Sequence, residues 1–411
     1  MENFMPNISD VELFSGLVKD IVSENPSAIV YGSLKEQFNA RKAELNLTDN
    51  VVFKMLDLDA KQVKPILDGE AKRISLFTMI KLAYFLNTSL DEVLMLSLQD
   101  MSPSQISDIQ LAKDAAYIMA HFDVGALTKI GFFKKGASVP ELKTRIVDYF
   151  GLNNLYEYCD TPLVKAFSQT RRKNKSDLMR EFWLSSAFHV FEIINNPYPY
   201  DRSALIRLIP SIRACTLNEK NGLTTVVKAL YRLGITVIYQ PTIKDLHLRG
   251  ATLVVNDKPC IILSDYNNRY PTVWFALLHE LCHVLSDLDL ICEYQYHISD
   301  GNGDLLLLDE DRCDNFASDY FLNGDNHNMI APYLDSPAIV QSYCKEWRVH
   351  PSLVYSIHCY SHPSDWKKYT SRIPKTDEML KGLNAVCFSE NPENEALPIN
   401  KIIDLKRTVY V

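Results

Sequence analysis

The stretch His279-Glu280-Leu281-Cys282-His283 lies inside a run of mostly apolar residues, 273–285. Residues four apart on a helix face the same side, so the two imidazoles can reach one metal ion. The glutamate between them lies within reach of a water on that ion and can act as a general base. Pro271 and Thr272 suit a helix start, and the apolar flanks predict burial. The stretch therefore predicts a buried metal-binding helix, against the alternative of ordinary core histidines.

A third ligand is expected downstream, because a catalytic zinc ion usually has three protein ligands and a water. Acidic residues gather at 309–314, at the start of a predicted helix whose apolar face includes Cys313 and Phe321. Glu310 lies near that face, which makes it the first candidate for the third ligand. Asp311 and Asp314 are weaker candidates on the same helix. A purely structural zinc site is the other interpretation, but it leaves Glu280 without a role.

The residues before the motif change from helical to strand periodicity. Gly234–Tyr239 predicts a strand, and residues 251–255 and 259–264 predict a hairpin that turns at 256–258. Most other segments have apolar residues at helical spacing. We therefore expect an α+β fold that is mostly helical, with a small sheet leading into the metal-binding helix.

Residues 31–98 predict a bundle of short helices, behind an amphipathic helix at 11–22. Asp59, Ser75 and Ser89 are suitable N-caps for three of them. The helices are expected at Gly32–Leu45, Asp49–Leu56, Ala60–Leu67, Leu76–Leu86 and Leu90–Leu96.

Two segments of this bundle, Leu67–Ser75 and Leu82–Val93, resemble the Xre-type helix-turn-helix, most closely the variant in HigA-type antitoxins. The resemblance implies that residues 59–67 form a DNA recognition helix. Pro65, late in that helix, and the neighbouring acidic residues keep open a second interpretation, a helical bundle used for protein contacts. The DNA contacts implied by the resemblance are, with the last two near the phosphates, Lys61, Gln62, Lys64, Lys72 and Arg73.

The middle and the end of the chain show helical patterns but no chemistry. The cluster Arg171-Arg172-Lys173-Asn174-Lys175 is interpreted as a solvated loop before a helix. Two closing helices are expected at 331–347 and 351–360, followed by a tail that holds a strand or no regular structure. In the middle, helices are expected at Lys113–His121, Pro140–Phe150, Ser176–Asn195, Asp201–Arg213 and Leu223–Leu233.

The segments Leu278–Leu285 and Glu310–Ala317 together resemble the ImmA/IrrE family of zinc metallopeptidases. The hairpin and the stretches Leu246–Gly250 and Val349–Val354 match as well, so the resemblance covers residues 225–360. It implies a zincin-like domain with one Zn²⁺ held by His279, His283 and Glu310, and Glu280 as the base. A helix-turn-helix fused ahead of the peptidase is a common companion in this family.

Three further residues carry open questions. Cys313 stands where the family usually has alanine, and Cys282 where it often has glycine or alanine. Cys282 is expected to pack in the core, with a redox-sensitive thiol as the alternative. His297 is a candidate for stabilising the oxyanion of the reaction, and a residue of a surface loop is the alternative.

The resemblances imply four segments: a helix-turn-helix domain at 1–98, a helical linker domain at 99–225, a metallopeptidase domain at 226–365 and a tail at 366–411. Their combination implies a bacterial or phage regulator that hydrolyses a peptide bond in a transcriptional repressor, in a toxin–antitoxin partner or in itself. DNA and a second copy of the chain are the other expected partners. The alternative is a HigA-like repressor or antitoxin whose peptidase domain only senses or dimerises.

Composition sets outer limits on these expectations. At 411 residues the chain is long enough for two or three domains, and its 47% apolar content is typical of a folded protein. The net charge of −8 gives no general preference for nucleic acid, although a local basic surface is compatible with it. No apolar run is long enough to cross a membrane, and the first residues lack a signal-peptide pattern. Nine scattered cysteines without a CxxC pair predict reduced thiols in a cytoplasm.

Overall fold

The computed structural model describes residues 32–71, 73–99, 103–160, 175–243, 246–294, 296–299, 310–380, 382–383, 388 and 398–410. Within them the chain is mostly helical and holds a four-stranded sheet, which confirms the predicted α+β class. Lys72, the helix expected at 11–22 and residues 171–174 of the basic cluster lie outside the described residues. No helix in the described ranges has the length and apolarity that a membrane crossing needs.

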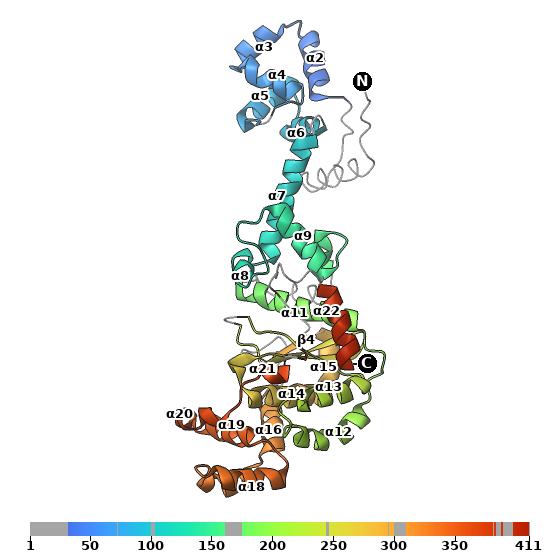
Figure 1. Cartoon of the computed structure of the whole chain (residues 1–411). Coiled ribbons are helices and arrows are strands. Elements are labelled where there is room, and N and C mark those ends of the chain that lie inside the picture. Colours follow the sequence, from blue (N-terminus) through green and yellow to red (C-terminus); the bar gives the residue numbers. More distant parts are fainter. Residues whose placement is uncertain are drawn as a thin grey trace. The chain divides into compact units, whose positions relative to one another are not determined.

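The chain divides into two compact units, Met1–Tyr117 and Ile118–Val411. Helix α7 (Pro103–His121) contains the division between them. Each unit has its own buried apolar residues. Figure 1 labels helices and strands of both units.

The first unit is a bundle of short helices whose bounds follow the sequence prediction closely. Asn46, Asp57, Gly69 and Asn87 have positive φ in the turns between helices, a conformation that Asn, Asp and Gly adopt most readily. A core of apolar side chains from all these helices, with Phe38 among them, holds the unit together. The helices are α2 (Leu34–Glu44), α3 (Asp49–Met55), α4 (Ala60–Leu67), α5 (Leu76–Leu86) and α6 (Leu90–Gln99).

Helix α4, the expected recognition helix, begins where the sequence predicted. Asp59 precedes it and accepts a hydrogen bond from the Lys61 backbone N–H at 2.9 Å. Pro65 lies in its last turn, and the helix is only eight residues long, so Pro65 marks its end rather than bending it. Ser89 accepts a hydrogen bond from the first turn of α6, as expected for an N-cap. Ser75 occupies the N-cap position of α5, but its side chain makes no capping hydrogen bond.

The second unit begins with helices around an aromatic cluster. The ring of Phe132 lies 4.9 Å from that of Tyr149 and 4.8 Å from that of Phe182, centroid to centroid. Such edge-on contacts stabilise a core beyond the area they bury. The elements of this region are α8 (Val124–Lys129), α9 (Val139–Phe150), η1 (Leu155–Asp160), α11 (Lys175–Ile194), α12 (Arg202–Cys215) and α13 (Gly222–Arg232).

The sheet contains the predicted strand and hairpin and one strand that the sequence did not indicate. Its order is β1-β3-β2-β4, with β1 parallel to β3 and β2 antiparallel to both its neighbours. Asn256 and Asp257 both have positive φ, which suits the two-residue turn between β2 and β3. The strands are β1 (Thr236–Tyr239), β2 (Gly250–Val255), β3 (Lys258–Leu263) and β4 (Tyr296–Ser299).

Helix α14 (Tyr270–Ser286) carries the pentapeptide motif and is buried along most of its length. It contacts β2 and β3 on one side and α16 (Glu310–Phe321) and α19 (Pro351–Ser361) on the other, as Figure 1 also shows. The prediction of a buried helix is confirmed. A helix enclosed in this way can hold polar side chains only if they find partners, because unpaired buried polar groups are costly.

The prediction of one continuous helix over 331–347 is wrong. A short 3-10 turn ends at Tyr333, and a new helix begins at Pro337, which has no backbone N–H to continue the earlier one. Besides α14, β4, α16 and α19, the described elements between β3 and residue 380 are η2 (Tyr266–Asn268), α15 (Leu288–Tyr294), α17 (Gly324–Ile330), η3 (Ala331–Tyr333), α18 (Pro337–Trp347), η4 (Pro363–Asp365), α20 (Trp366–Tyr369), η5 (Thr370–Arg372) and α21 (Asp377–Leu380).

The end of the chain is helical, so the expectation of a strand or an irregular tail is wrong for residues 398–410. Helix α22 (Pro398–Leu405) continues into a π-helical turn, η6 (Lys406–Tyr410). Ile402, Leu405 and Val409 recur at helical spacing and are buried. The Tyr410 hydroxyl donates to the Val237 carbonyl of β1. The last residues therefore belong to the core of the second unit.

Candidate metal centre

The two histidines of α14 direct the same ring nitrogen toward one point. His279 Nε2 and His283 Nε2 lie 3.1 Å apart, and both side chains are almost completely buried. Two nitrogen ligands on a tetrahedral zinc ion, with bonds of about 2.0–2.1 Å, lie about 3.3 Å apart. The helical spacing alone thus brings the rings to the separation that one ion requires.

Glu310, the first residue of α16, completes the group. Its Oε2 lies 3.1 Å from His279 Nε2, and its Oε1 lies 3.4 Å from His283 Nε2. Helix α16 is held against α14 by its buried face, which includes Cys313 and Ala317. Because Glu310 starts that helix, its carboxylate reaches the two imidazoles from the end of α16. One ligand atom from each residue lies within 4.8 Å of the other two.

Carboxylates also lie behind both histidines. His283 Nδ1 lies 2.8 Å from Asp287 Oδ2, and Asp287 accepts two hydrogen bonds from the Arg312 guanidinium at 2.7 and 2.8 Å. His279 Nδ1 lies 2.8 Å from Asp314 Oδ1, out of line for a straight hydrogen bond, so the attraction there is mainly between charges. Such partners fix which ring nitrogen faces a metal and make it a better ligand.

Glu280 lies on the sheet side of α14 and is fully buried. Its Oε2 accepts a hydrogen bond of 2.7 Å from the Thr252 hydroxyl of β2, whereas its Oε1 has no hydrogen-bond partner among the described residues. A side chain at Gly250 would place its Cβ 2.7 Å from that oxygen, so this position on β2 must be glycine for Glu280 to fit. A buried carboxylate oxygen without a donor is the arrangement expected where a water or substrate donates.

The electrostatics of the group favour a positive charge at its centre. Burial lowers the pKa of His279, but the carboxylates Asp314 and Glu310 outweigh it and raise the pKa to about 10. For His283, burial also lowers the pKa, but Glu310 and Glu280 raise it by more, so the net shift is upward. Burial raises the pKa of Glu310, but hydrogen bonds from His279, His283 and His297 hold it below its usual range. Two imidazoles and one carboxylate are a donor set that suits zinc, and these residues fit the ion.

His297 is a strand residue in contact with this group, and the alternative of a surface loop is wrong. It is 1% exposed and pairs in register with Thr252 across β2 and β4, so both side chains face α14. Its Nε2 lies 2.7 Å from Glu310 Oε1. This contact orients the Glu310 carboxylate; stabilisation of an oxyanion by His297 stays a prediction.

Cys282 is buried and has a second cysteine as its neighbour. The neighbouring Cys313 thiol, on α16, holds the pKa of Cys282 below its usual range. Cys313 Sγ also lies 3.6 Å from His283 Nδ1. Both thiols therefore fill the contact between α14 and α16, which agrees with the expectation that Cys282 packs in the core.

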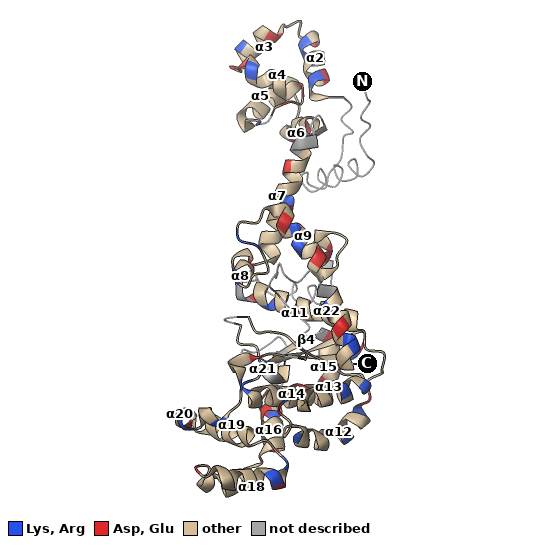
Figure 2. Ribbon diagram, in the orientation of Figure 1, with Lys and Arg blue, Asp and Glu red and all other residues tan. Residues whose placement is uncertain are grey.

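Other predicted site residues are not part of this centre. Asp311, the weaker ligand candidate, is exposed on α16. The predicted DNA contacts lie in the first unit, where Lys61, Gln62, Lys64 and Arg73 are exposed. Basic and acidic residues are interspersed along the helices of that unit, as Figure 2 shows.

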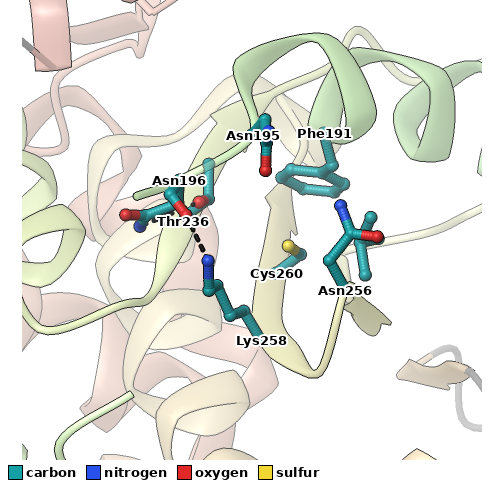
Figure 3. Close-up of a pocket in the computed structure, with 8 residues that line it drawn as sticks. Phe191, Asn195, Asn196, Thr236, Asn256, Lys258 and Cys260 are labelled. Atoms are coloured by element: carbon teal, nitrogen blue, oxygen red, sulfur yellow. Dashed lines mark hydrogen bonds between the residues drawn. The ribbon is translucent and has the colours of Figure 1, made fainter. Parts of the chain in front are cut away.

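A small pocket elsewhere in the second unit does not share the chemistry of the metal centre. Figure 3 shows Lys258 directed toward Asn196, to whose carbonyl it donates a hydrogen bond. The Asn196 amide in turn donates to Tyr231 O and to Thr236 Oγ1. Lys258, Asn196 and Thr236 are thus joined by hydrogen bonds. Its lining residues are Phe191, Asn195, Asn196, Thr236, Val255, Asn256, Lys258 and Cys260.

Sequence reasoning named His297 and Asp314 in other roles and did not identify Asp287 or Thr252. Asp287 was detectable, because it lies four residues after His283 on the same helical face. Thr252 gave no local signal, since its position beside the centre depends on the pairing of the strands. Comparisons of this chain with protein-family models, with curated proteins and with solved structures find no match.

Proposed function

We propose that the second unit is a zinc-dependent metallopeptidase and that the chain is a regulator with a DNA-binding head. The observation that carries the peptidase proposal is Glu280 Oε1, which bonds no residue in the described ranges and is buried beside two imidazoles and a carboxylate that converge on one point. A structural zinc site needs no such oxygen. A hydrolytic site needs a base at this position.

The chemistry follows from the donor set and from Glu280. A zinc ion held by His279, His283 and Glu310 supplies a Lewis acid that polarises a carbonyl and lowers the pKa of a water. Glu280 accepts the proton of the attacking water through Oε1 while Thr252 holds Oε2. Glu280 then delivers the proton to the leaving amine. Asp287 keeps His283 in the orientation that the site requires.

The position of the site in the sheet suggests how a peptide is presented. Strand β4 is the outermost strand beside β2, and it carries His297 against Glu310. An extended peptide that adds to this edge gains backbone hydrogen bonds and runs past the centre. A segment of a partner regulator, or of this chain itself, is the substrate class we propose.

The DNA-binding part of the proposal is supported by the pairing of charges in the first unit. Lys35, Arg41, Lys42 and Lys81 each form an ion pair there. The exposed bases that form no ion pair with a described residue of the first unit are Lys54, Lys61, Lys64 and Arg73. Unpaired exposed bases on and beside α4 are what binding to phosphates requires.

A second candidate function is a DNA-binding repressor or antitoxin in which the metallopeptidase fold only senses or dimerises. The contact between His297 Nε2 and Glu310 Oε1 favours it, because a third imidazole beside the ion could act as a fourth ligand and close the coordination sphere. Under this alternative, the zinc-loaded protein has no peptidase activity of its own. Its regulation of DNA then depends on the first unit.

Cleavage assays with two matched variants test the peptidase. Zinc-loaded protein is incubated with a library of peptides, and new N-termini are identified by mass spectrometry. We expect Glu280→Gln to retain zinc and to cleave about 10²- to 10⁴-fold more slowly, the usual contribution of a general base. Glu310→Ala should lose the zinc ion of this centre together with cleavage. Wild-type cleavage that Glu280→Gln leaves unchanged would contradict the proposal and favour the alternative.

DNA binding is tested by its dependence on salt. We expect the full chain to bind duplex DNA, and Lys61→Ala or Lys64→Ala to reduce the slope of log affinity against log salt by about 1 each. Lys35→Ala is the matched control, because its ammonium is already paired with Asp68. Equal salt slopes for all three variants and wild type would contradict DNA binding through α4 and favour the interpretation of the first unit as a bundle for protein contacts.

A further inference from the structure

A second group of three histidines lies on elements that the proposed reaction does not use. His327 is on α17, His358 is on α19, and His362 ends α19. One ring nitrogen from each lies within 4.8 Å of those from the other two. His358 and His362 are four residues apart, which is the spacing of the pair on α14.

The distances within this group are those of ligands to one ion. His327 Nε2 and His358 Nδ1 lie 3.1 Å apart, close to the separation of about 3.3 Å for two nitrogens on tetrahedral zinc. A hydrogen bond between these two rings accounts for that pair alone. His362 joins the group from the end of α19, where its Nδ1 lies 3.2 Å from the His358 carbonyl and its ring stacks on that of His358 at 4.4 Å, centroid to centroid.

Asp365 determines which nitrogen of His358 faces the group. Its Oδ2 lies 3.0 Å from His358 Nε2, so Nε2 carries a proton and Nδ1 presents a lone pair toward His327. A carboxylate behind an imidazole is the arrangement by which proteins orient metal-binding histidines. His358 is only 7% exposed, so its orientation is fixed by its surroundings.

The chemistry of the group selects the class of ion. Three imidazoles suit Zn²⁺, Cu²⁺ or Ni²⁺, whereas Mg²⁺ and Ca²⁺ prefer oxygen ligands. His362 is exposed, so an ion in this group is accessible from solvent.

We propose that His327, His358 and His362 bind a second divalent transition-metal ion, zinc in the first instance. The ion joins α17 to α19, with a fourth position open to water. Helix α19 packs against α14 and α16, the two helices of the first centre. The second ion therefore braces the layer of helices that supports the first centre, and it does so whether or not that centre is a peptidase.

Metal titration of the full chain tests this site. Untagged protein with the first centre removed, His279→Ala with Glu310→Ala, is stripped with a chelator and titrated with Zn²⁺ alone by calorimetry. We expect one zinc ion per chain. Adding His362→Ala should abolish this binding, and adding His247→Ala, an exposed histidine outside the group, should leave it intact. Circular dichroism checks that each variant is folded.

Two further variants make the test specific. His327→Ala should also abolish binding, and Asp365→Asn should weaken it about 10- to 100-fold, as expected for the partner of a ligand. Absence of zinc in the variant that lacks the first centre would overturn the proposal. So would zinc that is still held with unchanged affinity after His362→Ala.

Discussion

The two histidine pairs of the second unit have the same spacing but different surroundings. His279 and His283 lie in the middle of α14 between a sheet and two helices, and a carboxylate from α16 faces them. His358 and His362 lie at the end of α19, and a third imidazole from α17 faces them. Between the first pair stands Glu280, while the second pair encloses Cys359, Tyr360 and Ser361.

The comparison separates what spacing provides from what the surroundings add. Spacing of four on a helix brings two imidazoles together in both places. Only the first place adds a buried carboxylate with a free oxygen, so we propose hydrolysis there and only metal binding at the second. Three predictions test this distinction.

The largest expected effect is on stability in the presence of zinc. Glu310→Ala removes a ligand at a buried centre and should lower zinc affinity there at least about 100-fold, which corresponds to about 2.7 kcal/mol of lost stabilisation under saturating conditions. His362→Ala removes an exposed ligand of the second site, and we expect a smaller loss there. Thermal unfolding with excess zinc and with chelator measures both. Equal losses would mean that burial does not distinguish the two sites.

An intermediate effect is expected from the carboxylates behind the ligands. Asp287→Asn and Asp365→Asn should each weaken zinc binding at their own site about 10- to 100-fold. Asp287 is also the partner of Arg312 and is buried. In the metal-free protein, Asp287→Asn should therefore lower the free energy of unfolding by about 2 kcal/mol, whereas Asp365→Asn should lower it little. Urea unfolding in the presence of chelator measures this loss of unfolding free energy. A larger loss for Asp365→Asn than for Asp287→Asn would contradict the prediction.

The pH dependence of the metal-free protein should have opposite sign at the two sites. The folded-state pKa of His279, about 10, lies above the ordinary 6.5. Its contribution to stability is therefore complete below pH 6.5 and is lost as the pH rises through 10. The pKa of His327 is lowered, so its contribution is present above pH 6.5 and is lost as the pH falls.

Urea unfolding over a range of pH, with chelator present, compares wild type with His279→Gln and with His327→Gln. The difference between wild type and His279→Gln should shrink at high pH. The difference for His327→Gln should shrink at low pH. The same sign for both variants would show that the charges around the two groups do not differ as described.

Much of the local structure could be predicted from the sequence. The bounds of α4 and α5 agree with the prediction, because Asp59, Ser75 and the turn residues are local signals. The hairpin at Asn256 is equally local. The prediction was wrong at Pro337, where a new helix starts, and for residues 398–410, where apolar residues at helical spacing form a helix.

What the sequence by itself determined is that His279 and His283 share a helical face with Glu280 between them, because four residues make about one helical turn. Glu310 was the first of three candidates for the third ligand by its place on the helix, a resemblance supported it, and the packing of α16 on α14 brings it to the two rings. Only the tertiary structure brought His297 to Glu310, Thr252 to Glu280 and His327 to His358. Those contacts join residues from separate elements, and their distances depend on strand pairing and helix packing rather than on spacing along the chain.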